Sequence, residues 1–401
     1  MVTDNALRLV PLFRILTSSL RNDRWQEFKR VFRQGLSAIA IQTRRRVGSV
    51  LSLPVLASVG SVKEPPRLFQ LASGYWISQA LYVAAKLRIA DFLKDSPKSA
   101  SEIALATGAD EDSIYRLMRA LCSVGAFRTV GADKFTATAL GIPMQSDVPG
   151  SLRTMIVTLG ETHYAAWAHL LESVKTGNAG FPLAFGTEMF DYLGRDVEAG
   201  AIFNHAMSEY SALSSCAVLL SYDFSKTRSL VDVGGGCGRL LTSILRMYPS
   251  MEGTLFDMPP VVAAAQEKLE FHPCRERCTL VPGSFLDFVP PGADTYLMSS
   301  VIHDWDDEHS ITILRNCRRS MRRHSKILLL EFVVPTKKKS SFSTVLDLNM
   351  LVMNGGRERT AKEFRELFAA AGLKMTRIIP TMSPLNVIEA VRDQSADDSA
   401  S

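Results

Sequence analysis

Apolar residues follow two different spacings along the chain, and the change between them divides it into regions. Residues 67–145 begin with helical spacing and end in short strand-like runs, and residues 150–222 are helical throughout. From about residue 225 onward, short apolar runs alternate with helical segments, which predicts a parallel α/β sheet. The predicted strands are 230–233, 253–257, 294–300 and 326–331, and the predicted helices are 239–248, 306–321 and 361–371.

Residues 99–138 imitate a DNA-binding winged helix. Ser99 and Glu102 stand at the capping positions of a short helix, a second helix begins after Asp110, and a predicted hairpin follows it. The second helix opens on three acids, Asp110 to Asp112, which would repel DNA phosphates. The segment therefore favours a dimerisation and substrate-covering role over transcriptional regulation.

Positive charge is concentrated at the N-terminus. The 401-residue chain has a formal net charge of +5, yet residues 1–66 alone hold eleven Lys/Arg against four Asp/Glu. The remainder is slightly acidic, which argues against a nucleic-acid enzyme, because such an enzyme carries positive charge on its folded body. Trp25, Phe28 and Phe32 share one helical face among basic residues, a pattern typical of helices at a membrane surface. Packing of this helix on the protein's own dimer and an organellar transit peptide stay open as alternatives.

Cysteine usage and apolar runs favour a cytoplasmic protein, with peripheral membrane contact through residues 1–66 as an addition. The six cysteines are scattered, and the C-x3-C pair Cys274 and Cys278 has no second Cys/His pair nearby to complete a zinc site. Reduced thiols are the simplest interpretation. The best uncharged run, 47–62, contains Pro54 and is shorter than the roughly 20 apolar residues that span a membrane.

The strongest chemical signal is a glycine-rich turn between a predicted strand and a predicted helix. Asp232 lies in the strand, and Gly234, Gly236 and Gly238 follow it in the pattern D-x-G-x-G-x-G. Glycines at such a junction let the backbone approach a ligand closely, whereas dinucleotide folds use G-x-G-x-x-G. The next strand ends at Asp257, whose carboxylate can accept both ribose hydroxyls of an adenosine group. The pattern therefore predicts a site for an adenosine-containing cofactor.

A histidine stands just past the predicted strand 294–300. The carboxyl end of a parallel strand lines the ligand crevice, and a histidine, with an ordinary pKa of about 6.5, suits the role of general base. His303 needs a carboxylate to fix its tautomer, and Glu331 and Glu358 are the candidates. Asp304 ranks third, because its side chain should point elsewhere. No His/Asp/Glu set in the sequence has the spacing of metal ligands, so no metal is expected.

Five motifs follow one another between residues 230 and 360. They are LVDVGGGCG (230–238), FDMP (256–259), GSF (283–285), HDWDDE (303–308) and GGRERT (355–360). With them, residues 67–392 resemble the small-molecule O-methyltransferases of the plant caffeic-acid and bacterial antibiotic types, which use S-adenosyl-L-methionine. The resemblance implies an α/β fold: a Rossmann-like, seven-stranded methyltransferase domain preceded by a helical, winged-helix-like dimerisation domain. It also implies a homodimer that methylates a hydroxyl group of a small aromatic or lipophilic metabolite.

The resemblance also implies roles for individual residues. It makes His303 the catalytic base, flanked by Glu331 and Glu358, and it makes Asn354 a contact to the acceptor oxygen. Hydroxycarotenoid methyltransferases of this family also carry basic N-terminal extensions, which keeps a lipophilic acceptor open. Trp167 is a further candidate for the acceptor pocket.

Two positions depart from the pattern of the family. Ser284 stands where many members have an Asp that contacts the adenine amino group, and Ser299 stands where many have Lys or Arg. Both changes remove charged contacts to the adenosine end, so weaker or differently arranged cofactor binding is expected. Phe285 remains able to pack on the adenine face, and Met350 is a candidate for an apolar contact to the acceptor.

Two other functions remain as alternatives. A relative that keeps the cofactor but catalyses decarboxylation or hydroxylation tends to have lost the histidine, and a non-catalytic winged-helix regulator would not need His303, Glu331 and Glu358. The predicted organisation is a basic extension (1–66), a dimerisation domain (67–150), a helical substrate-lining region (151–224), a methyltransferase domain (225–392) and a polar tail (393–401).

Overall fold

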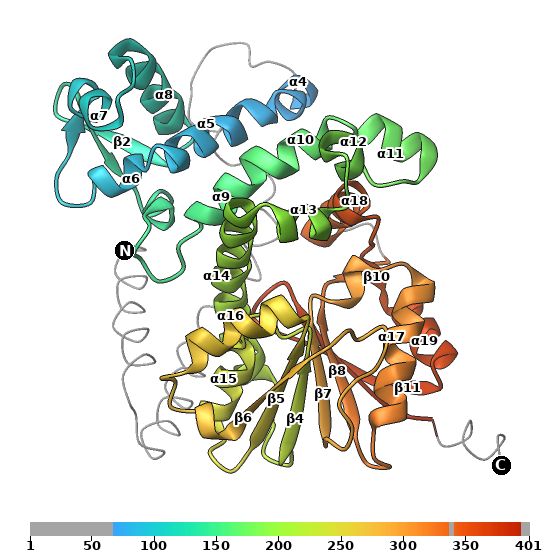
Figure 1. The fold of residues 1–401 in the computed structure, drawn as a ribbon. Helices are drawn as coiled ribbons and strands as arrows, with labels where there is room; N and C mark the ends of the chain where they lie inside the picture. The colour runs from blue at the N-terminus through green and yellow to red at the C-terminus, as the bar shows by residue number, and fades with distance from the viewer. Residues whose placement is uncertain (1–66, 337–340, 394–401) are drawn as a thin grey trace. The chain divides into compact units, whose positions relative to one another are not determined.

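The computed structural model describes residues 67–336 and 341–393, and these residues form two compact units that meet in the chain between Ser151 and Leu152 (Figure 1). The predicted amphipathic helix with Trp25, Phe28 and Phe32 lies outside the described residues, as do residues 394–401.

The first unit is a set of helices with a small sheet. Its helices are α4 (Arg67–Ala72), α5 (Gly74–Lys86), α6 (Ile89–Phe92), α7 (Ala100–Thr107) and α8 (Glu111–Ser123). Strands β1 (Lys98–Ser99), β2 (Phe127–Val130) and β3 (Lys134–Ala137) form a three-stranded sheet in the order β1-β3-β2. The antiparallel β2–β3 pair is the predicted hairpin wing.

Local capping sets the two helices of the winged-helix motif. Ser99 and Glu102 form a capping box at the start of α7, and the Asp110 side chain accepts the Ser113 N–H at the start of α8. Gly108 ends α7 in the left-handed conformation, which costs a glycine little. The buried face of α8 consists of Ile114, Met118 and Leu121. These elements confirm the predicted winged-helix architecture.

The second unit is built on a seven-stranded sheet in the order β11-β12-β8-β7-β4-β5-β6. The strands are β4 (Ser229–Val233), β5 (Glu252–Asp257), β6 (Cys278–Pro282), β7 (Thr295–Ser299), β8 (Lys326–Glu331), β11 (Leu373–Pro380) and β12 (Asn386–Arg392). The helices that follow these strands are α15 (Arg239–Met247), α16 (Pro259–Leu269), α17 (Asp307–Ser320), α18 (Phe342–Asn354) and α19 (Ala361–Ala370). The predicted Rossmann-like sheet is confirmed.

Alternating residues of the strands build two cores, one on each face of the sheet. On one face Leu230 and Leu328 pack with Leu241 of α15, together with residues of α16. On the other face Val231 and Leu329 pack with residues of α17 and α19. Figure 1 shows α15 and α16 on one side of the sheet and α17 and α19 on the other. Burial on both faces explains the continuous apolar runs of the sequence.

One strand departs from the predicted parallel arrangement. β12 is antiparallel to both of its neighbours, β8 and β11, while β8, β7, β4, β5 and β6 pair in parallel. The connection between β11 and β12 is too short for the crossover that a parallel pair requires. The sheet is therefore mixed.

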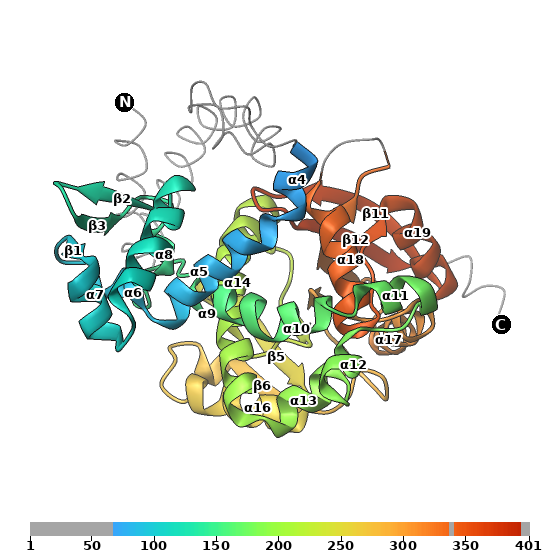
Figure 2. The same ribbon diagram turned by 90° about the horizontal axis from the view of Figure 1, so that it is seen from above.

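Helices precede the sheet in the chain, and most of them lie over its upper end in Figure 1, so that they cover part of the strands in Figure 2, seen from above. They are α9 (Arg153–Thr158), the π-helix η4 (Leu159–His163), α10 (Tyr164–Trp167), α11 (Leu170–Thr176), α12 (Phe181–Phe185), α13 (Met189–Arg195) and α14 (Val197–Ser221). Phe181 of α12 is buried in a cluster with Val352 and Met353 of α18, and the Gly180 N–H donates to the Val352 carbonyl at 2.8 Å. The predicted helical region 151–224 thus packs on α18.

Among the described residues, no helix combines the length and the apolar character that crossing a membrane requires.

Candidate active site

Loops that carry the predicted site residues gather at the carboxyl ends of the central parallel strands. β4 lies between β5 and β7: the chain runs outward from β4 through β5 to β6 on one side, and then crosses back to continue from β7 to β8 on the other. Such a reversal of strand order opens a crevice for ligands. The glycine-rich turn follows β4, Asp257 ends β5, His303 follows β7 and Glu331 ends β8.

The glycine-rich turn brings backbone close to neighbouring side chains. Gly234, Gly236 and Gly238 all have positive φ, between 57° and 74°. A Cβ at Gly234 would lie 2.8 Å from a methyl carbon of Val301, so a side chain there would collide. The Asp257 carboxylate accepts the Gly236 N–H at 2.8 Å through Oδ2 and the Met258 N–H at 2.7 Å through Oδ1. These hydrogen bonds fix the turn and the carboxylate together.

Asp232 is a buried carboxylate beneath this turn. Its side chain is 2 % exposed, and its Oδ2 has no hydrogen-bond partner among the described residues. Burial raises the pKa of Asp232 to about 7, and the negative charge of Asp257 adds to the effect. Burial also raises the pKa of Asp257, although the N–H groups of Gly236 and Met258 oppose it. An unpartnered buried oxygen of this kind is suited to a cationic or hydrogen-bond-donating ligand.

The residues predicted at the adenine end lie on both sides of the turn. The Phe285 ring lies 3.6 Å from the position of a Cβ at Gly234 and contacts Trp305 edge to face at 5.8 Å. The Ser284 Oγ accepts the Leu286 N–H at 3.2 Å. Ser299 is the last residue of β7 and is partly buried. Neither serine supplies the charge that the family pattern would place there.

The turn after β7 that carries His303 is held by Glu331. Ser300 has a φ of 53°, in the left-handed region that residues other than glycine rarely adopt. The chain then enters the 3-10 helix η6 (Ile302–Asp304). The Val301 and Ile302 N–H groups both donate to Oε1 of Glu331, at 3.1 and 2.9 Å. Glu331 is fully buried and thus anchors the backbone on which His303 stands.

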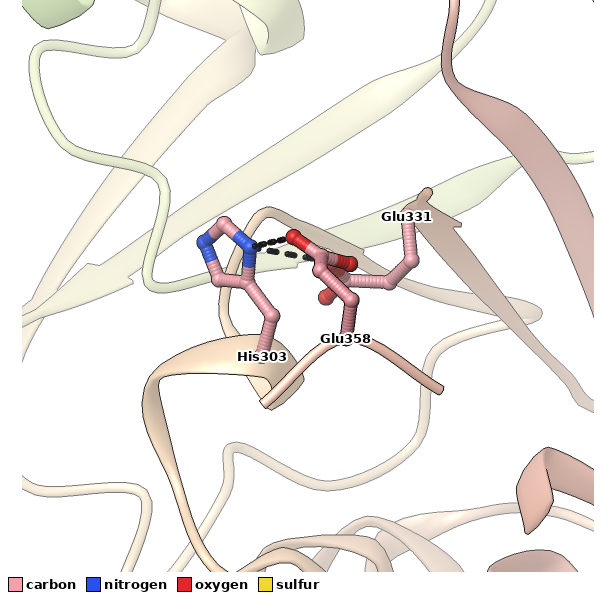
Figure 3. Close-up of side chains that lie close together, drawn as sticks. All are labelled: His303, Glu331 and Glu358. Atoms are coloured by element: carbon pink, nitrogen blue, oxygen red, sulfur yellow. Dashed lines mark hydrogen bonds and ion pairs between the residues drawn. The ribbon is translucent and has the colours of Figure 1, made fainter. Parts of the chain in front are cut away.

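Glu358 is the direct partner of His303, as Figure 3 shows. Nδ1 of His303 lies 2.8 Å from Oε1 of Glu358 and 3.9 Å from Oε2 of Glu331. The side chains of both glutamates are fully buried, and that of His303 is 13 % exposed. The GGRERT loop (355–360) lies close to His303 because it has glycines there: a Cβ at Gly356 would lie 2.1 Å from the His303 carbonyl oxygen. The structure therefore brings together the three predicted catalytic residues.

The expectation for Asp304 was wrong. Its Oδ1 lies 3.6 Å from Nε2 of His303, because the tight turn of η6 folds the side chain back toward the neighbouring ring. Burial alone would lower the pKa of His303, but the negative charges of Asp304 and Glu331 and the hydrogen bond to Glu358 raise it to about 10. The imidazole is thus a much stronger base than an ordinary histidine.

Two of the acids beside His303, Glu331 and Asp304, also have shifted pKa values. Burial raises the pKa of Glu331 to about 7 although the positive charge of His303 opposes the shift. Burial likewise raises the pKa of Asp304, against the opposing effects of His303 and of a hydrogen bond from Asn354.

The three predicted catalytic residues could also hold a metal ion. His303, Glu331 and Glu358 each offer one atom of a kind that binds metals, and these atoms lie within 4.8 Å of one another. The spacing of the residues in the sequence did not indicate this set. The 2.8 Å approach of His303 to Glu358 has the geometry of a charge-assisted hydrogen bond.

The predicted acceptor contacts are tied into the protein by their own hydrogen bonds or by burial. Asn354, at the end of α18, donates from Nδ2 to Asp304 at 2.7 Å and accepts the Gly356 N–H at 3.0 Å. The Trp167 indole N–H donates to Oδ1 of Asn349 at 2.8 Å, and Met350 is 6 % exposed. Their contact with an acceptor remains a prediction.

Sequence reasoning missed two residues that shape the site. Asp347 of α18 accepts the Glu358 N–H at 2.8 Å, and the guanidinium of Arg359 lies buried against the His303 turn. The signal for Arg359 was its place within GGRERT, directly after a predicted catalytic acid. No pattern in the sequence singled out Asp347.

Comparison with known proteins identifies the family. The family model described as the O-methyltransferase domain matches residues 167–374, and the model described as the O-methyltransferase dimerisation domain matches residues 69–142. The chain therefore belongs to the O-methyltransferase family, and it is a methyltransferase that uses S-adenosylmethionine.

Individual relatives cover most of the chain. It is 43 % identical over 331 residues, 82 % of this chain and 97 % of the relative, to the phenazine O-methyltransferase PhzM of Lysobacter antibioticus. It is 34 % identical over 325 residues, 81 % of this chain and 96 % of the relative, to the phenazine-1-carboxylate N-methyltransferase of Pseudomonas aeruginosa. The crystal structure of NcsB1, an O-methyltransferase from neocarzinostatin biosynthesis in complex with S-adenosylmethionine and 2-hydroxy-5-methyl naphthoic acid, matches with a TM-score of 0.70 at 33 % identity and covers 79 % of this chain and 96 % of that one.

The residues around the glycine-rich turn fit S-adenosylmethionine. The unpartnered, buried Oδ2 of Asp232 offers an acceptor beneath the turn, and a Cβ at Gly236 would meet nothing within 4 Å. Asp257 supplies a carboxylate at the end of the neighbouring strand, and the Phe285 ring supplies an apolar face. Two carboxylate acceptors, an open glycine and an aromatic ring suit a ligand in which an amino acid and a nucleoside are joined in one molecule.

Proposed function

We propose that this enzyme transfers the methyl group of S-adenosylmethionine to a hydroxyl oxygen of a small aromatic metabolite, with His303 as the general base. The observation that carries the proposal is the 2.8 Å contact between Nδ1 of His303 and Oε1 of Glu358. With its Nδ1–H donated to Glu358, the imidazole keeps Nε2 for the acceptor proton. Family membership already establishes the methyltransferase activity itself.

The cofactor would be held by residues of the glycine-rich turn and the neighbouring strands. Asp232, Gly236 and Asp257 would bind its polar parts, and Phe285 would pack on the adenine. When bound, S-adenosylmethionine supplies an electrophilic methyl group on a sulfonium sulfur. Because position 284 is a serine and not an acid, the adenine amino group of the cofactor should be bound less strongly than in relatives that have an acid there.

The protein's own part in the chemistry is to take up the acceptor proton. Nε2 of His303 accepts the hydroxyl proton as the oxygen becomes nucleophilic, and the resulting imidazolium keeps its hydrogen bond to Glu358. Glu331 holds the turn through its hydrogen bonds to two backbone N–H groups. The carboxylates of Glu331 and Asp304 add charge stabilisation to the imidazolium. The reaction proposed here needs no metal ion.

The raised pKa of His303 affects the pH at which the base is available. With a pKa of about 10, most of the imidazole binds a second proton at pH 7. Positive charge brought into the crevice lowers this pKa, because it opposes the imidazolium. We therefore expect the rate to rise with pH above 7, not near the ordinary histidine value.

A hydroxyl acceptor fits an intact base better than a nitrogen acceptor. A phenol has to lose its proton, whereas a ring nitrogen without hydrogen does not. The relatives that methylate oxygen and nitrogen suggest hydroxyphenazines and hydroxynaphthoic acids, together with matched amines, as the compounds to test.

Replacement of His303 tests the proposal. With an acceptor found in that panel, His303→Ala should lower kcat about 10²–10⁴-fold, the usual contribution of a general base. Its affinity for S-adenosylhomocysteine should change little, because the imidazole acts on the acceptor proton. His324→Ala, at an exposed histidine, is the matched control. Near-full activity of His303→Ala would mean that positioning of the reactants alone drives the transfer.

We also infer that the enzyme acts as a homodimer through its first unit. Leu68, Phe69, Leu71 and Trp76 on α4 and α5 are each more than half exposed, and the dimerisation family model covers most of these positions. Apolar surface of this kind is usually covered by a partner. Light scattering that shows a monomer at micromolar concentration would contradict this inference.

A further inference from the structure

A fully buried arginine follows Glu358 directly in the chain. Arg359 lies in the short strand β10 (Arg359–Thr360), which pairs in parallel with β9 (Val333–Val334), and its side chain is 1 % exposed. A buried guanidinium is costly unless hydrogen bonds and an opposite charge compensate it. Its contacts therefore indicate what it is placed to do.

The guanidinium binds the backbone on both sides of His303. Nη1 donates to the Ile302 carbonyl at 2.9 Å, and Nη2 donates to the Trp305 carbonyl at 2.8 Å. Nη2 also lies 2.8 Å from Oδ1 of Asp307, which Nε reaches at 3.1 Å. The planar guanidinium thus holds both ends of η6, through the carbonyls of Ile302 at its start and of Trp305 just after its end. A lysine has a single point of charge and could not hold both carbonyls in this way.

The same segment supplies the partner of the imidazole. Glu358 and Arg359 are consecutive, so the side chain that accepts from His303 and the side chain that fixes the His303 backbone share one short stretch of chain. The backbone N–H of Arg357 adds a third tie, a 2.8 Å hydrogen bond to the His303 carbonyl. A change in the position of the turn relative to this stretch would therefore alter the 2.8 Å His303–Glu358 contact.

We infer that Arg359 is a positioning residue that holds the His303 turn against Glu358 and so sets the hydrogen bond of the proposed base. The inference about catalysis rests on the proposed function. The inference about the position of the ring does not, because it concerns only groups within the protein.

The titration of His303 separates positioning from a plain charge effect. If Arg359 positions the turn, its loss loosens the hydrogen bond to Glu358, which is one of the interactions that raise the pKa of His303, and that pKa falls. If Arg359 acts only as a nearby positive charge, its loss removes repulsion of the imidazolium, and the same pKa rises. The two roles therefore predict shifts of opposite sign.

The experiment uses the full chain with isotope-labelled histidine and follows the His303 ring signal, assigned by its loss in His303→Ala. Arg359→Met and Arg359→Lys should both lower the titration midpoint, Met by about one pH unit, a tenfold change in the proton affinity. Arg365→Gln, at an exposed arginine of α19, is the control and should leave the midpoint unchanged. Calorimetry with S-adenosylhomocysteine should give the wild-type affinity for all three.

A raised midpoint in Arg359→Met, or an unchanged midpoint in Arg359→Lys, would overturn the inference in favour of a charge effect. Recovery of both variants only in unfolded form would overturn it in favour of a purely structural role. Failure of the proposed function is distinguishable, because His303→Ala would then retain activity while the Arg359 variants still shifted the ring titration.

Discussion

Replacement of Glu358 by glutamine tests the electrostatics of the candidate base most directly. Glu358→Gln keeps the size of the side chain and an oxygen able to accept the Nδ1–H of His303. It removes one negative charge 2.8 Å from the ring. Both side chains are largely shielded from solvent, so salt and water screen the pair little.

The magnitude follows from the kind of hydrogen bond that is lost. A hydrogen bond to a charged group contributes about 1.5–3 kcal/mol, against about 0.5–1.5 kcal/mol for a neutral one. The difference of roughly 1–1.5 kcal/mol corresponds to about one pKa unit. The pKa of His303, about 10 in the wild-type protein, should therefore fall by about one unit in the variant.

This shift has two opposing consequences for the rate. The fraction of His303 in its basic form at pH 7 rises about tenfold, while the weaker base removes the acceptor proton less readily. The rate at high pH should fall severalfold, and the rate at pH 7 should fall much less or not at all. The loss at high pH should remain smaller than that of His303→Ala, because Glu331 and Asp304 stay in place.

Two measurements check the argument. Magnetic resonance titration of the labelled His303 ring gives the pKa without an acceptor, and a pH–rate profile with an acceptor gives the kinetic limb. Glu366→Gln, on the exposed face of α19, is the matched control and should shift neither. An unshifted ring titration in Glu358→Gln, or an equal loss of rate at every pH, would refute the electrostatic reasoning.

Two further predictions concern the cofactor. Asp257→Ala should weaken binding of S-adenosylhomocysteine by more than about 1.5 kcal/mol, because a charge-assisted contact to the ribose is lost; calorimetry showing unchanged affinity would contradict the ribose assignment. Ser284→Asp should tighten cofactor binding if the serine leaves the adenine amino group without its acid, and equal or weaker binding in the same assay would mean that another group already fills that role.

The sequence was the best guide to those strands and helices whose buried residues recur at a regular spacing. β4, β7 and β8 agree with the predicted strands to within a residue or so at each end, because strands buried on both faces are continuous apolar runs. α7 and α19 start where their capping boxes do. The direction of β12 could not be predicted this way, since an apolar run does not say which way its neighbour runs.

The site was predictable where a motif fixes the backbone and less so where side chains meet through space. His303 comes just after β7 and Glu331 ends β8, and a parallel sheet brings the carboxyl ends of its strands to one edge. Glu358 lies in the glycine-containing motif GGRERT. The orientation of Asp304 depends on Ser300, a serine in the left-handed conformation, and on the tightness of η6. Sequence spacing carries no information on either.

The pKa of His303 depends on these same features, and for that reason the ordinary pKa of a histidine did not predict it. Burial alone would have made the imidazole a weaker base than a histidine in water. The opposite shift comes from the charge of Asp304 near Nε2 and from Glu331 and Glu358 near Nδ1. That arrangement requires the turn to stand where Arg359 and Glu331 hold it. The chemistry of the base is therefore set by backbone hydrogen bonds as much as by the acids themselves. A substitution that leaves every acid in place but moves the turn should change the titration of His303 as much as the loss of an acid does.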